Sequence, residues 1–219
     1  MRRTRVKICG ITRVEDALAA AAFGADAVGF VCYQRSRRFV EPGRLGDLAR
    51  ALPPFVTPVL LFVNATAAHV QSCLARVPNA LLQFHGDETA ADCERFERPY
   101  LRAVRIGEGV DLLDSARSFS TAVALLADAP AAGFGGGGVP FDWARLPAAE
   151  QRTMPLVLAG GLSDANVIDA IERVRPFAVD VSSGVESAPG IKSAERMQRF
   201  CAAVRQADRR QYPELSDAA

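Results

Sequence analysis

The 219-residue sequence predicts an α/β protein that folds as a single (β/α)8 barrel, the TIM-barrel architecture. Two observations predict it: short apolar segments recur eight times, and stretches with helical spacing separate them. The apolar segments are nearly continuous, as expected of strands covered on both faces of a parallel sheet. Eight strand–helix units are the number that closes a barrel. An open, doubly wound sheet is the competing architecture.

The predicted strands are rich in Val, Leu, Ile, Phe and Ala, and most run into small or polar residues. This pattern places turns, caps and candidate functional side chains at the carboxyl ends of the strands, where the loops of a barrel build active sites. The predicted strands cover residues 6–11, 27–33, 58–64, 80–86, 100–106, 122–128, 155–161 and 177–183.

Two of the intervening stretches have clear helical periodicity. Residues 13–25 are predicted to form a helix that stops at Gly24, because glycine commonly follows a helix C-terminus. Residues 164–174 are predicted to form a strongly amphipathic helix that is capped by Asp164. The predicted apolar faces consist of Val14, Leu18 and Ala21 or Ala22 in the first helix, and of Val167, Ile168, Ile171 and Val174 in the second.

Composition predicts one domain over residues 1–219, with a loose polar tail from about residue 207. The chain is 49% hydrophobic, which is enough to build a full core. Its acids and bases are well mixed and leave a formal net charge of +1, so nucleic acid is not an expected partner. No apolar run is long enough for a membrane span or a signal-peptide core, so a membrane is not expected either.

The cysteines and histidines argue against disulfides and against a metal site. The cysteines are odd in number and dispersed, and none forms a C-x-x-C pair, which fits a reducing cytoplasm. The two histidines, His69 and His85, offer little material for a catalytic triad or a multi-histidine metal centre. We interpret His85 as a hydrogen-bonding residue at a strand end. The five cysteines are Cys9, Cys32, Cys73, Cys93 and Cys201.

Two strand ends are predicted to bind phosphate. The segments "LAGGLSDANV" and "VDVSSGVE" each run from a strand into small residues that expose consecutive backbone N–H groups. They would follow strands seven and eight, a frequent phosphate site in barrels. Glycines that merely permit tight turns are the simpler alternative, which the position of both loops makes less favoured. The predicted phosphate residues are Gly160, Gly161, Ser183 and Gly184.

The segment "GFGGGG" at residues 133–138 formally contains G-x-G-x-x-G. It lies several residues beyond a strand and no acidic residue follows on a second strand, so it is a poor dinucleotide fingerprint. It also lacks the Lys-Ser/Thr of a phosphate-binding P-loop. We predict a mobile loop that closes over the site, followed by a helix at residues 141–146.

Cys9 and Asp128 are candidate reactive groups because each ends an apolar strand. Cys9 alone is equally compatible with a small buried hydrophobe. Asp128 makes a functional role more favoured, since a buried carboxyl group needs partners or a function. In a closed barrel the two strands lie on roughly opposite sides, so the thiol and the carboxyl could flank one small molecule. Arg37 and Arg38 are either solvated or bind a substrate carboxylate, and the residues leave this open.

The sequence resembles the phosphoribosylanthranilate isomerases of tryptophan biosynthesis. The similarity runs in order along nearly the whole chain, and its first and last motifs, "VKICGIT" and "RPFAVDVSSGVESAPGIK", are highly specific. The resemblance implies a (β/α)8 barrel that converts N-(5-phosphoribosyl)anthranilate into 1-(o-carboxyphenylamino)-1-deoxyribulose 5-phosphate by an Amadori rearrangement. It also implies that the reaction needs no cofactor and no metal. It does not predict the oligomeric state.

The resemblance also implies roles for individual residues. Cys9 corresponds to the general base that removes the C2′ proton, and Asp128 to the general acid that protonates the furanose ring oxygen. Arg38 corresponds to the arginine that faces the anthranilate carboxylate. The phosphate loops contain Gly160, Gly161, Ser183 and Gly184.

Three residues depart from the family pattern: Gln34 replaces a proline, Gly137 replaces a Thr or Ser, and Ala127 interrupts aliphatic residues. None of them removes a catalytic group. The alternatives are another phosphate-binding barrel enzyme or a barrel that binds a sugar phosphate without catalysis. An indoleglycerol-phosphate synthase would need a catalytic lysine at a strand end, and a ribulose-phosphate epimerase would need metal-binding histidines.

Overall fold

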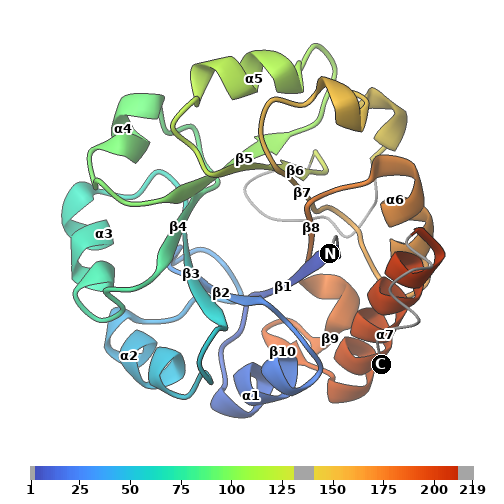
Figure 1. The fold of residues 1–219 in the computed structure, drawn as a ribbon. Coiled ribbons are helices and arrows are strands. Elements are labelled where there is room, and N and C mark those ends of the chain that lie inside the picture. The colour runs from blue at the N-terminus through green and yellow to red at the C-terminus, as the bar shows by residue number, and fades with distance from the viewer. Residues whose placement is uncertain (1–2, 131–140, 212–219) are drawn as a thin grey trace.

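The structure is a computed structural model that describes residues 3–130 and 141–211. Its parallel strands form a closed barrel in the order β1 to β8, and helices surround the barrel (Figure 1). Pairing of β1 with β8 closes the sheet, so the predicted barrel is confirmed and the open sheet is wrong. The barrel strands are β1 (Arg5–Cys9), β2 (Ala27–Val31), β3 (Thr57–Phe62), β4 (Leu81–Phe84), β5 (Tyr100–Arg105), β6 (Ala124–Asp128), β7 (Leu156–Leu158) and β8 (Ala178–Val181).

Helices follow most of the strands. Within the described residues they are α1 (Val14–Ala22), α2 (Pro42–Arg50), α3 (Ala67–Leu74), α4 (Ala90–Glu94), α5 (Leu112–Ser118), α6 (Val167–Val174) and α7 (Ala194–Gln211). Short elements complete the list: the 3-10 helices η1 (Trp143–Arg145), η2 (Ala149–Gln151) and η3 (Ser183–Val185), and the hairpin strands β9 (Glu186–Ala188) and β10 (Ile191–Lys192).

The connection between β6 and β7 differs from the prediction. The helix expected at residues 141–146 is only the single 3-10 turn η1, and η2 follows it. The glycine-rich segment 133–138, with Gly137, lies outside the described residues, so the predicted closing loop stays a prediction.

Alternate residues of each strand face the helices and the barrel interior. In β1, Val6 and Ile8 pack into the main core between the barrel and the helices. Lys7 and Cys9 face inwards, where Cys9 packs with residues of β2 and β3. A second apolar cluster, which includes Leu126, lies inside the barrel. This alternation leaves inward side chains at the carboxyl ends of the strands free to form a site.

Helix α1 does not bury the face that its periodicity predicts. Val14 and Leu18 are 37% and 47% exposed, whereas Asp16, Ala17 and Ala20 are buried. The small alanines let the helix pack closely against its neighbours. Asp16 is held by two hydrogen bonds from Arg13 and by one from the backbone of Lys192, so its burial is compensated. Specific partners thus override the hydrophobic pattern.

Two helix boundaries also differ from the predictions. Helix α6 begins at Val167 after Asn166, so Asp164 does not cap it and instead pairs with Arg199. At the other end of the chain, residues 207–211 belong to α7 rather than to a loose tail, because Asp208 is buried and accepts hydrogen bonds from Thr4. None of the described helices is long and apolar enough to cross a membrane.

Candidate active site

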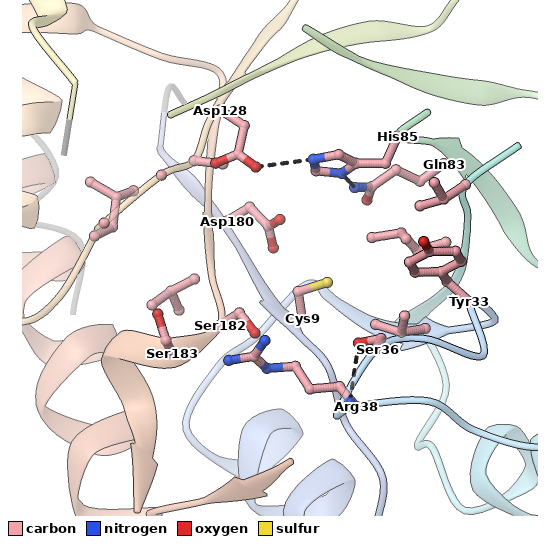
Figure 2. Close-up of a pocket in the computed structure, with 18 residues that line it drawn as sticks. Cys9, Tyr33, Ser36, Arg38, Gln83, His85, Asp128, Asp180, Ser182 and Ser183 are labelled. Atoms are coloured by element: carbon pink, nitrogen blue, oxygen red, sulfur yellow. Dashed lines mark hydrogen bonds and ion pairs between the residues drawn. The ribbon is translucent and has the colours of Figure 1, made fainter. Parts of the chain in front are cut away.

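A pocket lies at the carboxyl ends of the barrel strands (Figure 2). It forms there because the strands are parallel, so all their carboxyl ends meet at one end of the barrel. The pocket brings together most of the residues that the sequence predicted for a site, although they come from distant parts of the chain. Its polar lining consists of Cys9, Tyr33, Ser36, Arg38, Gln83, His85, Asp128, Asp180, Ser182 and Ser183.

Cys9 ends β1 and is buried at the pocket wall, with 6% of its surface exposed. It pairs with Gly29 of β2, and a β-carbon on Gly29 would lie only 2.8 Å from the Cys9 sulfur. The glycine therefore makes room for the thiol. Burial raises the pKa of Cys9, although the positive charges of Lys7 and Lys192 lower it in part. The thiolate that general-base chemistry needs is thus opposed by burial and favoured by the nearby lysines.

Asp128 ends β6 and faces the same pocket from the other side of the barrel. Its Oδ2 lies 3.0 Å from Nε2 of His85, and its Oδ1 accepts a hydrogen bond from the Ala129 backbone. Nε2 of Gln83 lies 3.1 Å from Nδ1 of His85, so Gln83 holds the imidazole ring that contacts Asp128. His85 is therefore a hydrogen-bonding residue that orients the carboxyl group, as its position at a strand end predicted.

Arg38 lines the pocket, but one edge of its guanidinium group is already engaged. Its Nε and Nη2 donate to the two carboxylate oxygens of Glu186, each over 2.7 Å. The aliphatic part of the side chain passes over Gly10, where a β-carbon would lie 2.4 Å from Cδ of Arg38. Lys192 also donates to Glu186 over 2.9 Å. The edge formed by Nη1 and Nη2 is the one left for a second carboxylate.

The loop after β7 has the backbone that the glycines predicted. Gly160 and Gly161 have φ values of 79° and 66°, which favour glycine. Their backbone N–H groups donate no hydrogen bond to any described residue, so they can donate to an anion. Asn166 shapes this loop by accepting a hydrogen bond from the Ser163 backbone and donating one to the Gly161 carbonyl.

The loop after β8 packs directly on the loop after β7. A β-carbon on Gly184 would lie 2.0 Å from the carbonyl oxygen of Leu162, so only glycine allows this close approach. Ser183 lines the pocket together with Gly160 and Gly161, whereas Gly184 is not part of the lining. Three of the four predicted phosphate residues thus reach the pocket, and the fourth holds the two loops together.

Sequence reasoning missed two charged residues within the barrel strands at the site, Lys7 and Asp180. Each interrupts an apolar strand, in "VKIC" and "FAVDV", and is buried. Asp128 was singled out because it ends an apolar strand. A charged residue inside an apolar strand is a related feature, and it could have found both Lys7 and Asp180. Tyr33 and Gln83 carried no comparable signal, because uncharged polar residues at strand ends are common.

Residues 6–203 match the family model of N-(5'phosphoribosyl)anthranilate (PRA) isomerase. The chain belongs to this family. A relative named N-(5'-phosphoribosyl)anthranilate isomerase from Leptothrix cholodnii is 59% identical over 95% of this chain and 94% of its own. One of the same name from Dechloromonas aromatica is 52% identical over 94% and 98%. Membership confirms the predicted family and the predicted isomerase of tryptophan biosynthesis.

Solved structures of the family share the fold. The phosphoribosyl anthranilate isomerase from Thermotoga maritima superposes with a TM-score of 0.81 at 37% identity, over 93% of this chain and 99% of its own. A phosphoribosyl anthranilate isomerase in complex with reduced 1-(o-carboxyphenylamino)-1-deoxyribulose 5-phosphate has a TM-score of 0.78 at 35% identity, with the same coverage. The barrel of that relative therefore holds a reduced form of the predicted product.

Proposed function

We propose that this chain converts N-(5-phosphoribosyl)anthranilate into 1-(o-carboxyphenylamino)-1-deoxyribulose 5-phosphate, with Cys9 as the general base and Asp128 as the general acid. The observation that carries the proposal is their placement: they end β1 and β6, which Figure 1 shows on facing sides of the barrel, and both line one pocket. A substrate in this pocket would lie between a thiol and a carboxyl group. That is the arrangement an acid–base isomerisation needs.

The reaction assigns one proton transfer to each side chain. Protonation of the furanose ring oxygen by Asp128 opens the ring and leaves a Schiff base between C1′ and the aryl nitrogen. Removal of the C2′ proton by the Cys9 thiolate then gives the enolamine, which tautomerises to the aminoketose. Each step moves a proton to or from a carbon or oxygen atom, so positioned side chains can catalyse both.

Asp128 has to carry a proton before the ring opens. Its Oδ2 lies 3.0 Å from Nε2 of His85. We propose that His85 keeps the carboxyl group oriented for this proton transfer.

The two ends of the substrate would bind on different sides of the pocket. The phosphate is assigned to the loops at Gly160, Gly161 and Ser183, where backbone N–H groups supply donors without a cluster of cations. The aryl carboxylate is assigned to the unengaged edge of Arg38. Gly161→Asp should weaken substrate binding strongly, because it places a carboxylate where the phosphate would lie. Unchanged affinity in a variant with an intact circular dichroism spectrum would refute the phosphate assignment.

The decisive experiment is a single-turnover assay with N-(5-phosphoribosyl)anthranilate, following loss of the substrate and appearance of the aminoketose. Cys9→Ala and Asp128→Asn should each lose about 10² to 10⁴ in rate and bind the substrate with nearly the wild-type affinity. Cys201→Ala is the matched control, because Cys201 is also buried but lies on α7 and packs into the main core. A folded wild-type protein that binds the substrate but leaves it unchanged would show a non-catalytic barrel.

We also propose that the enzyme acts in the cytoplasm on a freely diffusing small molecule. All five cysteines are unpaired and buried, and an unpaired set is expected in a reducing compartment. Cell fractionation with an antibody against the chain tests the location directly. Recovery in a secreted or membrane fraction would refute it.

A further inference from the structure

Strand β1 presents a second functional side chain to the barrel interior, directly below Cys9. Lys7 and Cys9 are two residues apart on one strand and therefore point to the same side of it. Lys7 is 4% exposed, and its Nζ donates to Oδ1 of Asp180 over 2.9 Å. Asp180 lies on β8 opposite Lys7 in the strand register. An ammonium group is thus held inside the barrel by a partner on the neighbouring strand.

The same glycine that makes room for the thiol also makes room for this ammonium group. A β-carbon on Gly29 would lie 2.8 Å from the Cys9 sulfur and 3.2 Å from Nζ of Lys7. The Cys9 sulfur and Nζ of Lys7 therefore both lie in the space that a side chain at Gly29 would fill. Burial alone would lower the pKa of Lys7, but Asp180 and Cys9 raise it above its usual value, so the amine stays protonated. Lys7 thus places a buried positive charge beside the sulfur.

Other charged groups also surround Cys9, and they act on its thiol in different ways. Asp180 raises the pKa of Cys9, whereas Lys7 and, more weakly, Lys192 lower it. Lys192 and Arg38 both donate to Glu186, which neutralises part of their charge. The other titratable groups that line the pocket are Tyr33, His85 and Asp128, and His85 and Asp128 pair with each other. Lys7 is therefore the main positive charge acting on the thiol.

We propose that Lys7 is a positioning residue of the isomerisation: its buried ammonium group stabilises the Cys9 thiolate, and Asp180 holds that ammonium group in place. The inference rests on the proposed role of Cys9 as the base. A thiolate in this pocket without Lys7 would face the carboxylate of Asp180 and a low-dielectric wall, both of which oppose negative charge. With Lys7 present, the proton on the thiol can leave and return while the ammonium group remains charged.

The first test measures the thiol itself, through its rate of alkylation by iodoacetamide across a range of pH. Only the thiolate reacts, so the midpoint of the profile reports its formation. Lys7→Met should move the midpoint up by about one to three pH units, the range expected for removing a close opposite charge. Asp180→Asn should move it down, because it removes a negative charge near the sulfur. Cys9→Ala supplies the background from the remaining cysteines.

The second test compares single-turnover rates of wild-type protein and Lys7→Met. We expect at least about a tenfold loss at neutral pH, with a ratio of rates that shrinks as the pH rises and the thiolate forms without help. The apparent KM should change far less. A purely structural role would lower the rate by the same factor at every pH.

Lys7→Met leaves Asp180 without its partner inside the barrel, and breaking a buried pair can prevent folding. The double variant Lys7→Met with Asp180→Asn removes both charges and should be compared with Asp180→Asn alone. Its alkylation midpoint should again be higher, because the only difference is the ammonium group. An unshifted midpoint in folded Lys7→Met, or in this pair, would overturn the inference.

The outcomes for Lys7 and for Cys9 can be separated. If Cys9→Ala keeps the wild-type rate, the base proposed above is wrong, whatever the alkylation profiles show. If Cys9→Ala is inactive and Lys7→Met leaves the profile in place, only the role of Lys7 is wrong. Opposite shifts in the Lys7 and Asp180 variants, together with an inactive Cys9→Ala, would support both.

Discussion

Replacing Arg38 by lysine tests how this site recognises its substrate. The guanidinium group already donates from Nε and Nη2 to Glu186, both over 2.7 Å, and lines the pocket with its other edge. A lysine keeps the positive charge but has a single donor atom. It can satisfy Glu186 or a substrate carboxylate, but it cannot present parallel hydrogen bonds to both.

The magnitude follows from the bonds that are lost. Removing one charge-assisted hydrogen bond in a site costs about 1.5 to 3 kcal/mol. Since about 1.4 kcal/mol corresponds to a factor of ten, Arg38→Lys should lower kcat/KM by about ten- to a hundredfold. Arg37→Lys is the matched control, because Arg37 is the neighbouring residue and is exposed. The kcat/KM of Arg37→Lys should be close to that of the wild type.

The assay pairs each protein with the natural substrate and with an analogue that lacks the aryl carboxylate. With the analogue, the kcat/KM of wild-type protein should fall by about the same factor as the kcat/KM of Arg38→Lys falls with the natural substrate. Combining the variant with the analogue should add little further loss, because both changes remove the same interaction. If the two losses instead multiply, Arg38 does not bind the carboxylate, and the assignment fails.

Three further predictions concern packing and pH. In steady-state assays, Gly184→Ala should raise KM much more than it lowers kcat. The added β-carbon would collide with the Leu162 carbonyl and push the loops after β7 and β8 apart. An unchanged KM would contradict this. Since burial raises the pKa of Cys9, kcat/KM should still be rising above neutral pH, and a profile that is flat from pH 6 upwards, roughly, would exclude a titrating thiol. Burial would raise the pKa of Glu186, but Arg38 and Lys192 hold it below its usual value. The Glu186 carboxylate therefore stabilises the fold at pH values above its unfolded-state pKa. This contribution disappears as the pH falls through the lower, folded-state pKa. Thermal unfolding against pH should therefore show Arg38→Ala losing stability at a higher pH than the wild type.

Much of the fold was encoded in local sequence patterns. Strands covered on both faces need apolar residues at nearly every position, so all eight strands appeared as apolar runs whatever their neighbours were. Because parallel strands end at one edge, a polar residue that ends such a run had to lie near the site. Cys9 and Asp128 were located by this reasoning, whereas Lys7 and Asp180 lie inside their strands and were missed.

Tertiary structure decided which polar groups meet. Arg38 and Glu186 are 148 residues apart, and Lys7 and Asp180 are 173 apart, so no local pattern relates the members of either pair. Their contacts depend on barrel closure, on strand register and on glycines that leave space for other side chains. The sequence alone could show that charged residues were buried, since burial follows from the pattern around each one. It could not show which partner compensates each charge, because that partner is brought close only when the barrel closes.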